Sequence, residues 1–146
     1  SGDIGVFGHG YTYTGHPVSC AVALKTLEIY ERDKIFEHAK KVGEYFQNSM
    51  KDIFKEDYVG EVRGIGLIAG IELYKDPSSK IAFEEAGKAG KILSDTCQKN
   101  GLIVRPILDT IALCPPLIIS EKEIDELTDK LKKSLQEAKD EIMKIH

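Results

Sequence analysis

Residues 8–17 read Gly8-His9-Gly10-Tyr11-Thr12-Tyr13-Thr14-Gly15-His16-Pro17, and the rest of the chain is organised around this stretch. Its glycines allow backbone torsions that other residues resist, and they let the main chain approach a ligand closely. Its hydroxyl and free N–H groups are hydrogen-bond donors, and a helix that begins at Pro17 adds the positive end of its dipole. The stretch therefore suits an anion, above all a phosphate group. The alternative is an ordinary glycine-rich connection whose hydroxyls cap the helix.

Length and composition are those of a globular protein. The 146 residues suffice for one core of ordinary size, and 42% apolar with 30% charged residues argues against disorder. No apolar run approaches the roughly 20 residues of a membrane span, and Ser1-Gly2-Asp3 lacks the start of a signal peptide. A formal net charge of −4 leaves no basic face for nucleic acid. We therefore expect a cytoplasmic protein with neither a membrane nor a nucleic-acid partner.

Cysteine and histidine usage indicates neither disulfides nor a metal centre. Cys20, Cys97 and Cys114 are widely spaced and odd in number, so we expect reduced cysteines in the core. His9 and His16 are candidate metal ligands, but no third ligand stands at a suitable spacing. We therefore expect these histidines to form hydrogen bonds within their loop, and the protein to hold no metal.

Hydrophobic periodicity predicts four helices and four strands. The helices are expected at 17–31, 34–54, 81–99 and from 121 toward the C-terminus. Two strands are expected within 58–73 and two more at 102–105 and 110–113, besides an extended piece at 4–7. Thr14 or Gly15 is expected near the cap of the first helix, and Ser120 with Glu123 forms a capping box before the last. The order predicts an α+β domain with a small, mostly antiparallel sheet packed with helices.

Arginine is scarce, and Arg105 is the second candidate for chemistry. It stands at the end of an expected strand, just before Pro106, where its guanidinium can point into a cleft. A guanidinium matches a carboxylate through two parallel hydrogen bonds, which a lysine cannot copy. The alternative is a structural ion pair with an acid such as Asp109. Arg63, between two expected strands, is expected to be structural.

Six segments carry a resemblance to a known family. They are FGHGYTYTGHP at 7–17, CAVAL at 20–24, VRGIGL at 62–67, GIEL at 70–73, GLIVRP at 101–106 and PPLII at 115–119. In this order the chain resembles the class III pyridoxal-phosphate-dependent aminotransferases, with the ω-amino acid:pyruvate transaminases closest in character. The motifs cover nearly the whole chain and are specific together, although each alone is not.

The resemblance implies the C-terminal portion of a fold-type I enzyme. Residues 1–32 would form the end of the large domain, with the cofactor-phosphate loop and a long connecting helix, and residues 33–146 the C-terminal small domain. Thr12 matches the threonine that binds the phosphate of the partner subunit's pyridoxal 5'-phosphate through its hydroxyl and N–H, so the full-length protein would be a homodimer. Tyr11 matches a residue beside that cofactor and in the substrate pocket. Arg105 matches the arginine that binds a substrate carboxylate.

The same resemblance implies what lies outside this chain. The family's Schiff-base lysine precedes the phosphate loop, and no lysine here stands in a matching motif, so we assign no catalytic residue and expect the fragment alone to be inactive. The chain also begins with serine, as a trimmed protein or a piece of a longer one would. After Arg105-Pro106 the family usually has a glycine before the aspartate, whereas this chain has Leu108-Asp109. This departure leaves the substrate preference open.

The expected activity follows from the family. The full-length protein would transfer an amino group from an amine or ω-amino acid to a keto acid. Decarboxylation or amino-group migration within the same family is one alternative. A stand-alone α+β anion-binding or interaction module is another.

Overall fold

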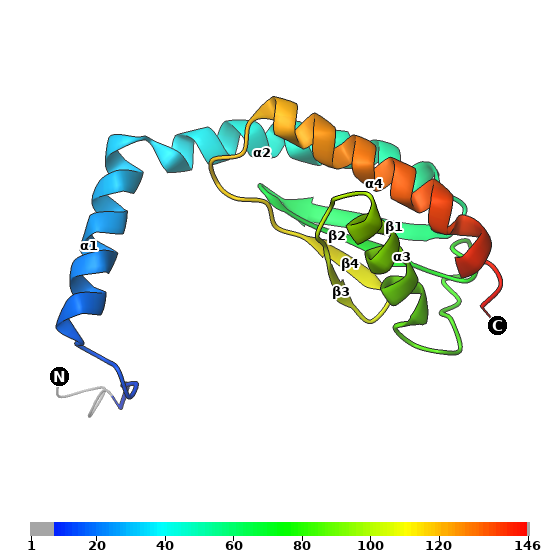
Figure 1. Ribbon diagram of the computed structural model, residues 1–146, viewed down its shortest axis with the longest axis horizontal. Helices are drawn as coiled ribbons and strands as arrows, with labels where there is room; N and C mark the ends of the chain where they lie inside the picture. The colour runs from blue at the N-terminus through cyan, green and yellow to red at the C-terminus, as the bar shows by residue number, and fades with distance from the viewer. Residues whose placement is uncertain (1–7, 146) are drawn as a thin grey trace. The chain divides into compact units, whose positions relative to one another are not determined.

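The computed structural model describes residues 8–145, so the extended piece expected at 4–7 lies outside the described residues. Contacts divide the chain into two compact units, Ser1–Ile35 and Phe36–His146. Figure 1 colours the elements of both units along the chain. Within residues 8–145, no helix is both long enough and apolar enough to cross a membrane.

The first unit contains a tight turn followed by α1 (Pro17–Arg32). His16 is the N-cap residue, because its Nδ1 accepts a hydrogen bond from the Ser19 N–H at 3.4 Å, and Pro17 occupies the first helical position. Gly15 lies next to the N-cap, in agreement with the expectation that Thr14 or Gly15 stands near it, and the cap itself is His16. Gly15 adopts a φ of +75°, so the chain turns there and the helix begins after His16.

The surface of α1 also differs from the expectation. Its apolar composition predicts burial between two layers, whereas none of its residues is buried and Val18, Val22, Leu24 and Leu27 are exposed. The reason is that the described residues of this unit include no second element for the helix to pack against. The helix therefore presents apolar side chains that this unit leaves uncovered.

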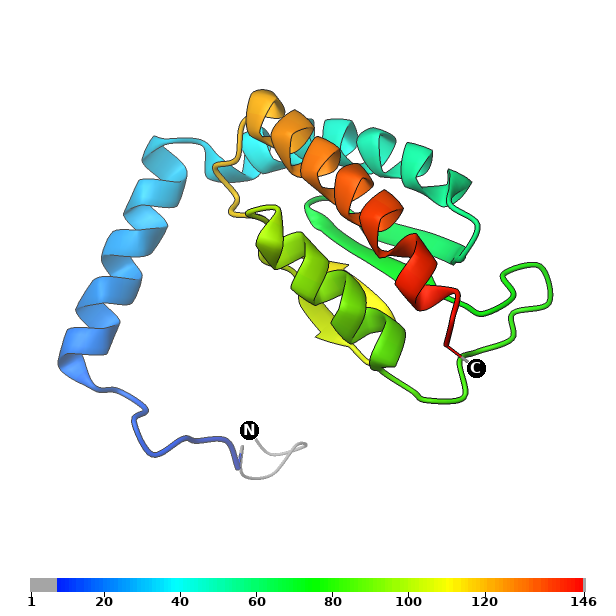
Figure 2. The same ribbon diagram turned by 45° about the vertical axis from the view of Figure 1, so that its right-hand side comes forward.

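The second unit is built on an antiparallel sheet with the strand order β1-β2-β4-β3. Its strands are β1 (Val59–Ile65), β2 (Ile68–Leu73), β3 (Arg105–Ile107) and β4 (Thr110–Leu113). Its helices are α2 (Ile35–Lys51), the short 3-10 helix η1 (Asp52–Lys55), α3 (Lys88–Lys99) and α4 (Glu121–Ile142). The three α-helices lie over one face of the sheet (Figures 1 and 2). The predicted α+β fold with a small antiparallel sheet is confirmed.

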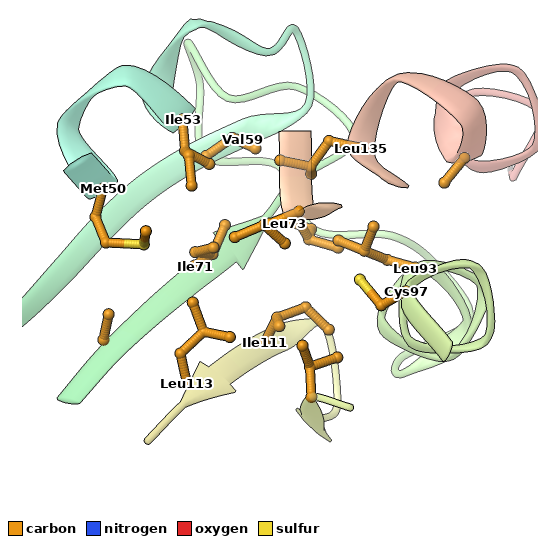
Figure 3. Close-up of a cluster of buried hydrophobic side chains, with 14 of the residues drawn as sticks. Met50, Ile53, Val59, Ile71, Leu73, Leu93, Cys97, Ile111, Leu113 and Leu135 are labelled. Atoms are coloured by element: carbon orange, nitrogen blue, oxygen red, sulfur yellow. The ribbon is translucent and has the colours of Figure 1, made fainter. Parts of the chain in front are cut away.

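The core lies between the sheet and these helices. Every second side chain of β2 and β4 is buried, as the two-residue period of a strand requires: Ala69, Ile71, Leu73, Ile111 and Leu113. The helices contribute Phe46, Met50, Leu93, Cys97, Leu131 and Leu135, among others, to the same cluster. Figure 3 shows how side chains from the strands and helices converge there.

The last helix forms as its local sequence predicts. The Ser120 Oγ accepts a hydrogen bond from the Glu123 N–H at 3.3 Å, and the Glu123 carboxylate accepts one from the Ser120 N–H at 2.8 Å. This reciprocal capping box satisfies two backbone donors that the helix itself leaves unpaired. Apolar residues at helical spacing form its buried stripe: Ile124, Leu131, Leu135, Ala138 and Ile142.

Two element boundaries differ from the expectations. α3 begins at Lys88 and not at 81, because Gly87 has a φ of +86° and Ile81 instead pairs with Asp76 in an isolated bridge. β3 begins at Arg105 and not at 102, since its ladder with β4 starts at the Arg105–Ala112 pair. The start of α3 is therefore set by the local backbone at Gly87, and the start of β3 by its pairing with β4.

Two of the cysteines and the end of α2 also differ from the expectations. Cys97 is buried as expected, but Cys20 and Cys114 are exposed, one on the uncovered α1 and the other just after β4. α2 ends at Lys51, and the chain continues as η1, where we expected one helix to 54.

Candidate functional site

Three N–H groups of the turn before α1 are hydrogen-bonded within the turn. The Thr14 N–H donates to the Tyr11 carbonyl at 2.9 Å, and the Tyr11 N–H donates to the Thr14 Oγ1 at 2.7 Å. The His16 N–H donates to the Tyr13 carbonyl at 3.1 Å. These bonds hold a rigid turn whose apex is the Thr12-Tyr13 pair.

Thr12, at the apex of this turn, is a residue whose donors remain open. Its side chain is exposed. Among residues 8–145, neither its N–H nor its hydroxyl has a hydrogen-bond partner. Two donors on one residue, held at the apex of a braced turn, can bind an anion without first breaking an internal bond.

The hydroxyls of this turn do not cap the helix, as the alternative interpretation expected. The cap is the His16 imidazole, and the Thr14 hydroxyl closes the turn. The Tyr11 ring is exposed and meets the His9 ring edge to face, with ring centroids 5.0 Å apart. Within the described part of the chain, no three His, Cys, Asp or Glu side chains come together as metal ligands do.

Arg105 lies at the first position of the edge strand β3, and its side chain is exposed. Pro106 follows it, and a proline has no N–H to donate, so it is tolerated on this outer strand. Among residues 8–145, no carboxylate forms an ion pair with the Arg105 guanidinium. The alternative partner, Asp109, instead accepts hydrogen bonds from the Gly87 N–H at 2.8 Å and the Gly90 N–H at 3.1 Å.

Arg63 behaves as the structural arginine that its position predicts. Its Nη1 donates to the Glu72 carboxylate at 2.6 Å and lies 3.5 Å from Glu61. The hydrogen bond to Glu72 raises the pKa of Arg63 above its ordinary value. The two carboxylates are therefore engaged by a cation, which removes them as candidates for acid–base chemistry.

The Arg105 side chain lines an apolar groove of about 550 Å³. The other lining residues are Ile68, Leu102, Ile103, Val104, Ile107, Ala112, Leu113, Cys114, Pro115, Pro116, Ile119 and Leu127. Arg105 is the one charged residue among them. Arg105, whose guanidinium has no ion-pair partner among residues 8–145, lies among apolar residues, and this combination suits a ligand that joins a carboxylate to an apolar body.

The structure adds a feature that the sequence reasoning missed. Asp109 is the side chain that caps α3, although it follows that helix by ten residues. The sequence offered one signal near this feature, since Leu108 stands where the family usually has glycine. In the structure Leu108 adopts a φ of +52°, which glycine adopts more readily than other residues. Thr12 and Tyr11 thus share one turn of the first unit, and Arg105 shares a hairpin with Asp109 in the second.

Comparisons with known proteins agree with these motifs. The family Aminotransferase class-III matches residues 2–135. A probable gamma-aminobutyrate transaminase 3 of Oryza sativa subsp. indica is 38% identical over 145 residues, which are 99% of this chain and 28% of that protein. Gamma aminobutyrate transaminase 3 of Solanum lycopersicum is 39% identical, with the same two coverages. The chain therefore spans less than a third of the length of these relatives.

Solved structures give the same result. A transaminase with L-alanine superimposes with a TM-score of 0.87 at 39% identity, over 97% of this chain and 34% of that one. The omega transaminase of Pseudomonas jessenii in complex with PMP gives 0.85 at 36% identity, over 94% and 30%. On its motifs, its fold and a family match over most of its length, the chain belongs to the class III aminotransferases.

Proposed function

We propose that this chain is the C-terminal part of a pyridoxal-phosphate-dependent aminotransferase that moves an amino group from an amine or ω-amino acid to a keto acid. One observation carries the proposal. Thr12 and Arg105, the residues that the family motifs assign to ligands, both have polar groups with no partner in the described chain. An unpaired donor costs free energy only when it is buried. The exposed donors of Thr12 and Arg105 carry no such cost and are free to bind a ligand.

Thr12 fits the phosphate of pyridoxal phosphate. A phosphate presents several acceptor oxygens, and Thr12 offers a hydroxyl and an N–H on one braced turn. The neighbouring Tyr11 ring would line the cofactor and substrate pocket. When bound, pyridoxal phosphate supplies an electron sink for the carbon that loses or gains the amino group. In the family arrangement this turn serves the partner subunit, so we propose a homodimer.

Arg105 would hold the carboxylate of the substrate. Its guanidinium offers two parallel N–H groups, so it fixes both the position and the orientation of a carboxylate. The apolar groove beside it accommodates hydrocarbon rather than charge. Residues of this chain would therefore anchor the cofactor and select the substrate, whereas the reacting lysine would belong to the rest of the protein. For that reason we propose that the chain alone is inactive.

Half-reactions of the full-length enzyme test this function. Arg105→Lys is expected to raise the KM for pyruvate about 10- to 150-fold, which corresponds to a lost charged hydrogen bond of about 1.5–3 kcal/mol. The KM for an amine donor without a carboxylate should change less than about twofold, because that donor has no group for Arg105 to bind. Lys34→Arg, on the exposed surface, is a matched control. Failure of the full-length protein to transaminate any amine or amino acid would overturn the proposal.

A further inference from the structure

The position of Arg105 depends on a short hairpin. β3 has three residues and pairs with β4 from Arg105–Ala112 to Ile107–Thr110, so Leu108 and Asp109 form a two-residue loop. A two-residue loop sets the register of its strands. Since Arg105 has no ion-pair partner in the described chain, the hairpin backbone alone decides where its guanidinium can reach.

Asp109 ties this hairpin to two other elements. Its carboxylate oxygens accept hydrogen bonds from the Gly87 N–H at 2.8 Å and the Gly90 N–H at 3.1 Å, and its carbonyl accepts one from the Leu73 N–H at 2.9 Å. The N-cap residue Gly87 has no side chain to perform this role, and the first turn of α3 contains no acidic residue. Asp109 therefore replaces the missing cap, and its negative charge lies at the positive end of the helix dipole.

The neighbouring Leu108 shows that the hairpin is held under constraint. Its φ of +52° lies in the left-handed region that L-residues with a side chain resist. Its side chain is 67% exposed, so burial does not explain the conformation. Its carbonyl oxygen lies so close to α3 that a Cβ on Gly90 would come within 2.0 Å of it. A two-residue hairpin loop itself requires a positive φ at its first position, and the close approach of the Leu108 carbonyl to α3 places this loop against the helix end that Asp109 caps.

We infer that Asp109 is a positioning residue for Arg105, because its carboxylate fastens the β3–β4 hairpin to the N-terminus of α3. The inference rests on the proposed role of Arg105 in binding a carboxylate. Without the Asp109 carboxylate, Leu108 can relax and the three-residue strand before it shifts. The guanidinium then meets a substrate carboxylate in the wrong place, while a donor without a carboxylate is unaffected.

The test uses separate half-reactions of the full-length dimeric enzyme with Asp109→Ala and Asp109→Asn. Asp109→Ala should raise the KM for pyruvate about tenfold, since misplacing a binding group by about 1 Å costs up to about 100-fold. Asp109→Asn keeps one acceptor oxygen and should raise the KM for pyruvate less. This variant also serves as the second test if the alanine protein fails to fold. For a carboxylate-free amine donor, KM and kcat should stay within about twofold of the parent values. Asp95→Asn replaces an exposed carboxylate on α3 and should leave the KM for both substrates unchanged.

A double-mutant cycle separates positioning from a merely structural role. In an Arg105→Ala background, Asp109→Asn should raise the KM for pyruvate no further, because the group that it positions is gone. Equal losses for pyruvate and for the amine, or additive effects in the cycle, would overturn the inference while leaving the proposed function standing. If Arg105→Ala itself leaves the KM for pyruvate unchanged, the proposed role of Arg105 fails, and the inference fails with it.

Discussion

Replacing Gly90 by alanine should destabilise the second unit, although the same change in an ordinary helix is stabilising. Gly90 is the third residue of α3, and a Cβ built on it lies 2.0 Å from the Leu108 carbonyl oxygen, 3.0 Å from its carbonyl carbon and 3.2 Å from the Asp109 Cα. All three are backbone atoms, so no flexible side chain can move aside. Ordinary contact between carbon atoms is about 3.5–4.0 Å, and the hairpin would have to move away from the helix.

The expected size follows from three contributions. Overpacking costs about 1–3 kcal/mol. Moving the hairpin away breaks at least one hydrogen bond to the Asp109 carboxylate, which costs about 1.5–3 kcal/mol. Alanine in a helix interior returns about 1 kcal/mol relative to glycine. The net loss is about 1.5–5 kcal/mol in the free energy of unfolding.

Urea unfolding followed by circular dichroism measures this loss, because a change in stability at constant m-value shifts the midpoint. Gln98→Ala, on the exposed side of the same helix, is the control and should stay within about 0.5 kcal/mol of the parent. A Gly90→Ala protein as stable as the parent, or more stable, would show that the hairpin is not pressed against α3, and the reasoning on Asp109 would lose its steric support.

Three further predictions concern the hairpin, the core and the cofactor. Leu108→Gly removes a left-handed strain of about 1–2 kcal/mol and adds a glycine entropy cost of about 0.5–1 kcal/mol. We therefore expect urea unfolding to show a gain of about 0–1.5 kcal/mol in the free energy of unfolding. A clear loss of stability would contradict the strain at Leu108. Burial raises the pKa of Tyr58, whose hydroxyl donates to the Leu135 carbonyl at 2.6 Å. Above about pH 10 the unfolded chain ionises this phenol while the folded one keeps its proton, so stability falls as pH rises. The fall should be shallower in Tyr58→Phe, and an identical pH profile would refute the assignment. For the isolated chain, the two donors of Thr12 supply about 3–6 kcal/mol against an association cost of at least about 4 kcal/mol. Equilibrium dialysis should therefore give a Kd for pyridoxal phosphate of millimolar or weaker, and micromolar binding would mean that this chain holds more of the cofactor site than we propose.

Much of the fold could be predicted where the signal is local. The capping box of Ser120 and Glu123 and the stripe of α4 depend on residues within a few turns of one another, so the sequence was sufficient. The β1–β2 hairpin could be predicted in outline as two strands within residues 58–73, but the place of its loop, where Gly66 has a φ of +56°, came from the structure. For the site, the motifs identified Thr12, Tyr11 and Arg105, and the roles of these residues remain predictions.

By itself, the sequence predicted the order of the four α-helices and the four strands, because these elements depend on residue types at short spacings. Its motifs also carried the resemblance to the family. The tertiary structure alone decided that Arg105 has no acidic partner in the described chain and that Asp109 caps α3. It also decided that α3 starts at Lys88. These features depend on groups that lie about 20 residues apart in the sequence, such as Gly87 and Asp109. No local pattern encodes whether the Asp109 carboxylate will meet the Arg105 guanidinium or the N–H groups of α3.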